Sequence, residues 1–145
     1  MILNTNSSSS GQSLVEVVVT TAIAMLILVA LVAGATVAVR NTQYSRTRAQ
    51  AMELNRQATE WLRSERAKSW SEFWNKLADG VYCLNNLDLG RHRNCSSDEL
   101  IDSTFKREAH VVKEGSDKVT VTVVTSWTDS QGEHREETVT YLTRW

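Results

Sequence analysis

An uninterrupted apolar run near the N-terminus constrains this chain more than any other feature. No charged side chain occurs from Val17 to Val39. As an α-helix rising about 1.5 Å per residue, the run is roughly 35 Å long, which exceeds a bilayer hydrocarbon core of about 30 Å. Its polar side chains are those of Thr20, Thr21 and Thr36, whose hydroxyls can bond back to the helix backbone. We therefore expect a helix that is membrane-inserted at some stage.

A cleaved secretory signal peptide is an alternative interpretation of this run. Such peptides have a basic start and an apolar core of about 7 to 15 residues. Here the core is longer, and no Lys or Arg precedes it. The small residues Ala33, Gly34 and Ala35 do have the composition of a cleavage site, so this alternative stays open.

Charge is confined almost entirely to the remainder of the chain. All 16 Lys and Arg lie at or after Arg40, as do all acidic residues except Glu16. Because these charges cancel, they argue against nucleic acid or anionic lipid as a principal partner. Glu16 stands at the edge of the apolar run, where an unpaired carboxylate costs on the order of a few kcal/mol. It either marks the membrane interface or has a charged partner on another subunit.

The residues around Glu16 form a specific motif. The segment Gly11-Gln12-Ser13-Leu14-Val15-Glu16, followed at once by the uncharged run, resembles the processing site of type IV prepilins and pseudopilins. The resemblance implies cleavage by a prepilin peptidase between Gly11 and Gln12, and N-methylation of Gln12. It also implies an assembly role for Glu16, whose carboxylate would pair with the N-terminal ammonium of a neighbouring subunit. A carboxylate in a low-dielectric helix bundle strongly favours such a cation.

The resemblance also implies a division of the chain and a set of partners. Residues 1–11 would be a leader peptide, residues 12–39 the transmembrane and assembly half of a long helix, and residues 40–145 an exported head. Partners would be other pilin subunits through the N-terminal helix, the prepilin peptidase and the membrane. The chain would be a single-pass protein of the cytoplasmic membrane with an extracytoplasmic head, and would enter a pilus or pseudopilus on assembly.

The distribution of arginines favours the opposite orientation. Arg40, Arg46 and Arg48 follow the apolar run, whereas the segment before it has no basic residue. By the positive-inside rule, this pattern favours a cytoplasmic C-terminus. An inverted single-pass protein therefore stays open on charge alone.

The helix is expected to continue well beyond the apolar run. The chain has no proline, so nothing forces a break between Leu14 and about Ala67. After Arg40 the pattern becomes amphipathic, and we expect its apolar stripe to pack on a sheet with Trp61 as the anchor. The stripe consists of Leu54, Ala58, Trp61 and Leu62.

A short second helix and a sheet are predicted after it. Ser69 and Glu72 fit a capping box that would start a helix ending near Gly80. Segments 104–113, 118–128 and 135–145 are rich in Val, Thr and aromatic residues and are predicted strands, with 82–89 a further short strand or loop. Alternation places one set of residues on a common face, Val119, Val121, Val123 and Trp127, and likewise a second set, Val139, Tyr141 and Trp145.

The predicted fold class is therefore α+β. A long N-terminal hydrophobic helix would pack its C-terminal half on a small antiparallel sheet of about three or four strands, as in pilins. Charged residues around the last turn, Glu133, Glu136 and Glu137, would form a soluble edge that discourages pairing with other chains.

The two cysteines, Cys83 and Cys95, are separated by a loop-like sequence. In an exported domain a disulfide is the natural interpretation, and it would stabilise the fold by roughly 3 kcal/mol in the chain-entropy model. Free thiols are an alternative, and His92 between the cysteines would allow a zinc site. Three candidate ligands without a fourth are a weak zinc signal.

The sequence has no recognised catalytic pattern. His92, His110 and His134 lie in separate segments, and neither a nucleophile elbow nor a phosphate-binding glycine loop is present. We expect no catalytic residues, no metal, no cofactor and no enzymatic activity. Arg91 and Arg93 form a small basic cluster in the cysteine loop, which is either a solvated loop or a weak contact for nucleic acid or a surface.

The resemblance therefore implies a structural role. The chain would be a minor pilin or pseudopilin that is assembled into, or primes, a type IV pilus-like filament used for adhesion, motility, DNA uptake or secretion. The alternative is a permanently anchored single-pass envelope protein whose head binds a ligand or partner and which keeps residues 1–11.

Overall fold

A computed structural model describes residues 10–144, with side chains from residue 14 onward. The predicted leader residues 1–9 and Trp145 lie outside the described residues. Two units are distinguished, residues 1–44 and residues 45–145. The first contains the beginning of helix α1, and the second contains the rest of α1, a short helix and a sheet.

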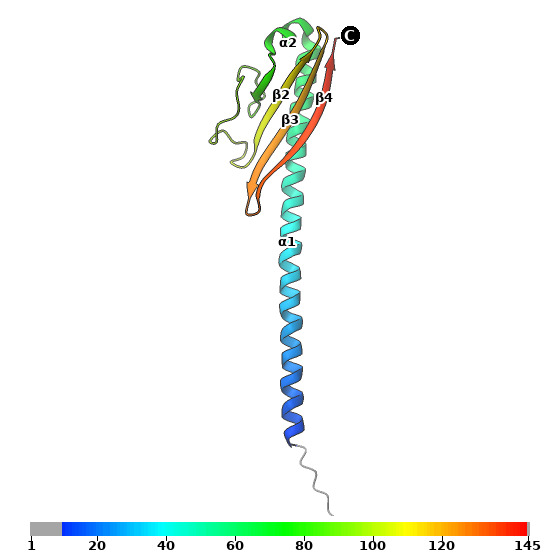
Figure 1. The fold of residues 1–145 in the computed structure, drawn as a ribbon, viewed down its shortest axis with the longest axis vertical. Coiled ribbons are helices and arrows are strands. Elements are labelled where there is room, and N and C mark those ends of the chain that lie inside the picture. Colours follow the sequence, from blue (N-terminus) through cyan, green and yellow to red (C-terminus); the bar gives the residue numbers. More distant parts are fainter. Residues whose placement is uncertain (1–9, 145) are drawn as a thin grey trace, which may run out of the picture. The chain divides into compact units, whose positions relative to one another are not determined.

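Helix α1 extends over Ser10–Lys68 and is 59 residues long (Figure 1). The prediction of an unbroken helix from Leu14 to about Ala67 is confirmed. Helix α2, Trp70–Lys76, begins at the predicted cap, because the Ser69 hydroxyl accepts a hydrogen bond from the Glu72 N–H at 3.3 Å. It ends before Gly80 because the backbone at Leu77 turns extended and buries that side chain in the core.

The sheet is a four-stranded antiparallel meander in the order β1-β2-β3-β4 (Figure 1). The predicted α+β class and the three C-terminal strands are confirmed, and the segment after α2 supplies the fourth strand. Gly115 and Gly132 occupy the two turns with positive φ, a conformation that glycine adopts without strain. The strands are β1 Gly80–Cys83, β2 Lys106–Glu114, β3 Lys118–Asp129 and β4 Gly132–Thr143.

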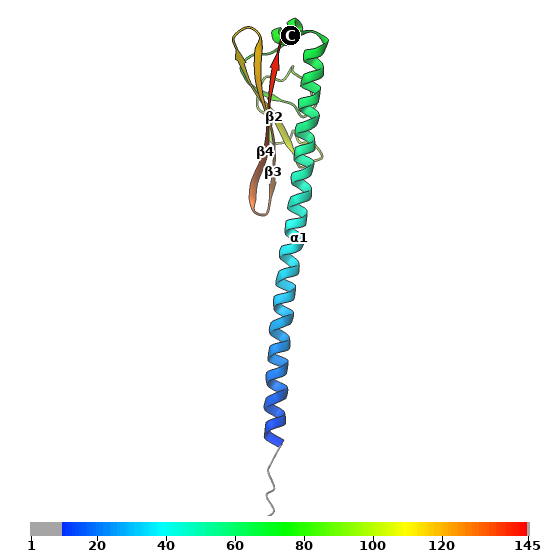
Figure 2. The ribbon, with the colours of Figure 1, turned by 90° about the vertical axis from the view of Figure 1, so that its right-hand side faces the viewer.

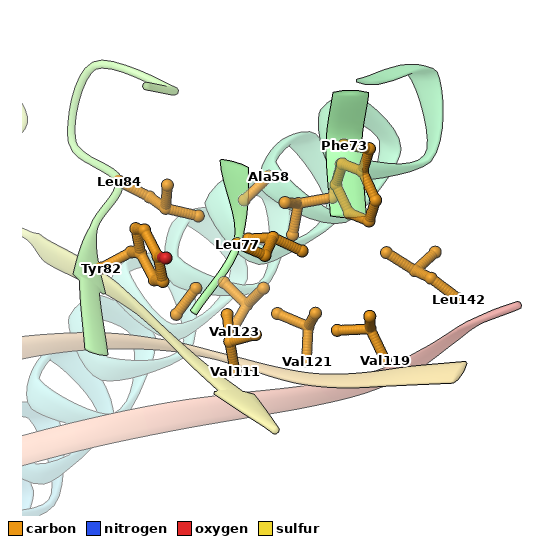
Figure 3. Packing of buried hydrophobic residues seen from close by; sticks show 12 residues of the cluster. Ala58, Phe73, Leu77, Tyr82, Leu84, Val111, Val119, Val121, Val123 and Leu142 are labelled. Atoms are coloured by element: carbon orange, nitrogen blue, oxygen red, sulfur yellow. The ribbon is translucent and has the colours of Figure 1, made fainter. Parts of the chain in front are cut away.

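The inner face of the sheet packs on the C-terminal part of α1, alongside which it lies in both views (Figures 1 and 2). Ala58 of the helix, alternate valines of β3, and Leu77 and Phe73 form one buried cluster (Figure 3). Leu62 of the helix belongs to the same cluster. The predicted β3 face is confirmed, since its members are all buried: Val119, Val121, Val123 and Trp127.

One detail of this packing differs from expectation, and a second was not predicted. Trp61 is only partly buried at the margin of the core, and the fully buried members of the predicted stripe are Ala58 and Leu62. Successive helix residues are rotated by about 100°, so Trp61 and Leu62 cannot both face the sheet centrally. Val139 and Tyr141 do share a face, but it is the outer one, with 51% and 64% of their surfaces exposed.

Glu136 belongs to the interior side of β4, which corrects its assignment to a solvated edge. Its carboxylate accepts from the Arg48 Nε at 2.6 Å, and its carbonyl accepts from the Asn55 Nδ2 at 2.9 Å. Asn55 is itself fully buried and accepts from the Thr125 hydroxyl at 2.7 Å. One amide side chain on α1 therefore satisfies partners on both β3 and β4.

Arg107 is a buried cation with 3% of its surface exposed. Its guanidinium donates to the carbonyl of Leu84 at 2.9 and 3.1 Å and to that of Leu54, on α1, at 2.9 Å. Burial lowers the pKa of Arg107 to about 10, because the charged form loses solvation. The side chain joins β2, the segment after β1 and α1 through backbone carbonyls that have left water.

Replacing Arg107 with alanine should lower the free energy of unfolding by about 3 kcal/mol, because buried carbonyls would lose their donors. Urea unfolding of the full chain in detergent micelles, followed by tryptophan fluorescence, measures this change. The control Arg135→Ala, at a side chain that is 74% exposed, should alter it by less than about 0.5 kcal/mol. Equal effects of the two substitutions would contradict the linking role of Arg107.

Candidate functional site

The first candidate site is the apolar segment of α1. Every side chain described from residue 14 to residue 39 is exposed, including large ones such as Leu26, which is 71% exposed, and Val29. By length and composition this helix can cross a membrane, as predicted. A continuous apolar surface of this extent is not stable in water and indicates a membrane or protein interaction surface.

The polar groups inside this segment are satisfied by the helix itself. The Thr20 hydroxyl donates to the Glu16 carbonyl at 2.6 Å, and the Thr21 hydroxyl donates to that of Val17 at 2.8 Å. Thr36 likewise donates to the Ala33 carbonyl at 2.7 Å. The predicted back-bonding is thus observed, and it leaves these hydroxyls compatible with an apolar surrounding.

Glu16 lies on the first turns of α1 and is exposed. No described residue forms an ion pair or side-chain hydrogen bond with its carboxylate. Gly11 and Gln12 lie in the same helix, with Gln12 one turn before Glu16, but the Gln12 side chain is outside the described residues. Their roles in cleavage, methylation and assembly therefore stay predictions.

The second candidate site is the loop between β1 and β2, which a disulfide closes. Cys83 and Cys95 are bonded, with their Cα atoms 4.8 Å apart. Of the three alternatives for these residues, the structure has the disulfide. His92 stacks on Tyr82 at a centroid distance of 4.6 Å, with its Nε2 3.2 Å from the Asp79 carbonyl oxygen. Among residues 10–144 there is no group of three or more His, Cys, Asp or Glu side chains that could hold a metal ion.

Gly80 makes room for this ring. A Cβ at Gly80 would lie 2.6 Å from the His92 Nε2, and the glycine has φ of +135°. The position therefore requires glycine both for its backbone conformation and for the close approach of the ring. The result is a loop that folds back onto β1.

Glu99 is the electrostatic centre of the loop. Its carboxylate accepts from both terminal nitrogens of Arg93 at 2.8 Å, from Arg91, and from the Ser96 N–H at 2.9 Å. The Arg93 hydrogen bonds, then the Ser96 amide and the two arginine charges, lower the pKa of Glu99 to about 2. Sequence reasoning identified the basic cluster but missed its anion, which lies outside the loop that the cysteines delimit.

The three histidines occupy separate places. His110 is exposed on β2, as predicted. His134 stacks on Trp127 at 5.4 Å, and its Nε2 lies 2.9 Å from an Asp129 carboxylate oxygen. The local β3–β4 turn brings these three side chains together.

Loss of the disulfide should destabilise the head. The double substitution Cys83→Ser and Cys95→Ser should lower the free energy of unfolding by roughly 3 kcal/mol, since the unfolded chain regains the entropy of an open loop. Urea unfolding of the full chain in micelles measures it. Reduction of the wild-type protein should give a similar loss, and an unchanged midpoint in reductant would contradict the bond.

The Glu99 network should make stability depend on acid pH. Because the folded pKa of about 2 lies below the ordinary value of 4.5, its contribution is present above pH 4.5 and is lost as the pH falls towards 2. Glu99→Gln should therefore be less stable than wild type at neutral pH, and the difference should shrink across this window. Thermal unfolding from pH 7 to pH 2 measures the difference. In an Arg93→Gln background the effect should be smaller, and an equal effect there would show that Arg93 is not the main cause.

A scan of the chain against protein-family models gives no match, and searches among curated proteins and among solved structures give none. The functional conclusion therefore depends on the residues of this chain. Of the predicted site residues, the structure brings Cys83 and Cys95 together, and it places Glu16 on an exposed turn of α1.

Proposed function

We propose that this chain is a structural subunit, a minor pilin or pseudopilin, that is processed by a prepilin peptidase and assembles through its N-terminal helix into a type IV pilus-like filament. The observation that carries the proposal is the fully exposed apolar segment of α1 with Glu16 at its start. A membrane covers such a segment before assembly, and the helices of neighbouring subunits cover it afterwards.

Glu16 gives the proposal its specificity. A plain membrane anchor has no need for a carboxylate at this position, where desolvation without a partner is costly. In a filament, the new N-terminal ammonium at Gln12 of a neighbouring subunit would supply the missing cation. The Cys83–Cys95 disulfide supports an extracytoplasmic head, because disulfides persist in oxidising compartments.

The second candidate is a permanently anchored single-pass envelope protein with a binding head. It uses the same helix but predicts that residues 1–11 remain attached and that Glu16 is dispensable. A weak contact of Arg91 and Arg93 with nucleic acid or a surface stays a prediction, and it would compete with the ion pairs that both arginines make with Glu99.

The mass of the N-terminal peptide, measured on protein purified from its native membrane, separates the two candidates. The proposal expects a chain that begins at Gln12, with or without one added methyl group. A chain that begins at Met1 would overturn it in favour of the anchored binding protein.

Glu16→Ala should leave membrane insertion unchanged but reduce incorporation into sheared filaments by about tenfold or more, because the neighbouring ammonium would lose its buried partner. The control Glu72→Ala, at an exposed carboxylate of α2, should be incorporated like wild type. Normal incorporation of the Glu16 variant would contradict the assembly role.

A further inference from the structure

Strand β4 is an edge of the sheet, and one hydrogen bond shows which of its backbone groups face outward. The Arg144 N–H donates to the Asp117 carbonyl at 2.8 Å, just beyond the pair Lys118↔Thr143. The β3–β4 register continues without a bulge to the turn, and hydrogen-bonded pairs alternate along an antiparallel ladder. Even-numbered residues of β4 therefore bond to β3, whereas odd-numbered residues direct their N–H and C=O groups to the free edge.

This free edge has open backbone groups at Glu137, Val139 and Tyr141. None of the described residues donates to or accepts from these groups across the edge. The edge is closed further along, where the Thr143 carbonyl accepts from an Arg66 guanidinium nitrogen at 3.1 Å. A stretch of strand is thus available for pairing with another polypeptide.

The side chains along the same stretch do not protect it. Natural edge strands discourage pairing with charges, prolines or bulges. Here the charges lie nearer the turn, from Glu133 to Glu137, and residues 138–143 carry none. The exposed Val139 and Tyr141 instead form a β-prone, apolar rim on the outer face.

A groove of about 550 Å³ runs beside this edge, between β4 and α1. Met52 and Thr59 contribute its less polar lining. Four carboxylates and two guanidiniums also line it, so its net charge is negative, and it remains so when Arg48, which pairs with Glu136, is included. The charged lining residues are Glu53, Arg56, Glu60, Arg63, Glu136 and Glu137.

We propose that the free edge of β4 at residues 137–141 is a strand-addition site for an extended segment of a partner protein. The segment would pair with the open backbone groups and would place β-branched or aromatic side chains beside Val139 and Tyr141. Its alternate side chains, facing the acidic groove, would be Lys or Arg. Main-chain bonds supply affinity in this mode, and the alternating side chains supply specificity.

A second copy of β4 fits this edge less well. Its inner-face positions are the even-numbered ones, which include Glu136, Thr138 and Thr140 and no Lys or Arg. Paired edge to edge, it would bring a further carboxylate to a groove that already has excess negative charge. Charge complementarity therefore selects a basic partner strand, and this inference does not depend on the role of the N-terminal helix.

The test uses the full chain in detergent micelles and a synthetic peptide of about eight residues in which Val alternates with Lys. Amide hydrogen exchange, read residue by residue, is the measurement. The peptide should slow exchange at Val139 and Tyr141 by about tenfold or more. The matched peptide with Glu in place of Lys should give no protection.

Two substitutions at one position separate backbone pairing from side-chain contact. Val139→Pro removes an outward N–H without breaking a β3–β4 bond, and should weaken peptide binding by about tenfold or more. Val139→Thr keeps the N–H and should bind within about threefold of wild type. Exchange data on the wild-type chain decide the question even if the proline variant does not fold.

Three results would overturn the proposal. Absence of peptide protection at the edge would show that β4 does not accept a strand. Equal protection by the Lys and Glu peptides would remove the role of the acidic groove. Protection that appears without peptide and increases with protein concentration would identify a second copy as the occupant.

Discussion

The buried contact between α1 and the inner face of the sheet supports everything else in the head. A small antiparallel meander has marginal stability unless one face is covered. Ala51 and Ala58 have small side chains, which let the helix and the sheet approach closely, and Leu62 fills the space against the β3 valines. The same contact determines which face of β4 is inside and hence which backbone edge and which side chains remain accessible.

Burying this interface also forces polar groups to find partners. Asn55 joins α1 to β3 and β4. Arg107 joins α1 to β2 and to the segment after β1. Both side chains donate to backbone carbonyls inside the head, so loss of either would remove hydrogen bonds from a dry environment. The β1–β2 loop is organised similarly, but at the surface, by Glu99 and the disulfide.

The helix α1 serves two environments along one chain. Its residues 14–39 are apolar on all sides and exposed, whereas from Ala51 onward one face is buried in the head and the other is charged. The first segment needs a membrane or other helices, which is the basis of the proposed filament role. The open edge of β4 offers a different mode of association, through backbone pairing, to a partner of suitable charge.

Local patterns in the sequence determined the elements of this protein. The lack of proline, the uncharged run, the Ser69 cap and the alternation of β3 predicted the helices, the strands and the α+β class, because these signals depend on neighbouring residues. Only tertiary packing decided that Leu62 rather than Trp61 is central, that Val139 and Tyr141 face outward, and that Glu99 pairs with both Arg91 and Arg93. It also decided between a disulfide and free thiols at Cys83 and Cys95. These outcomes depend on contacts between residues far apart in sequence, whose geometry no local periodicity contains.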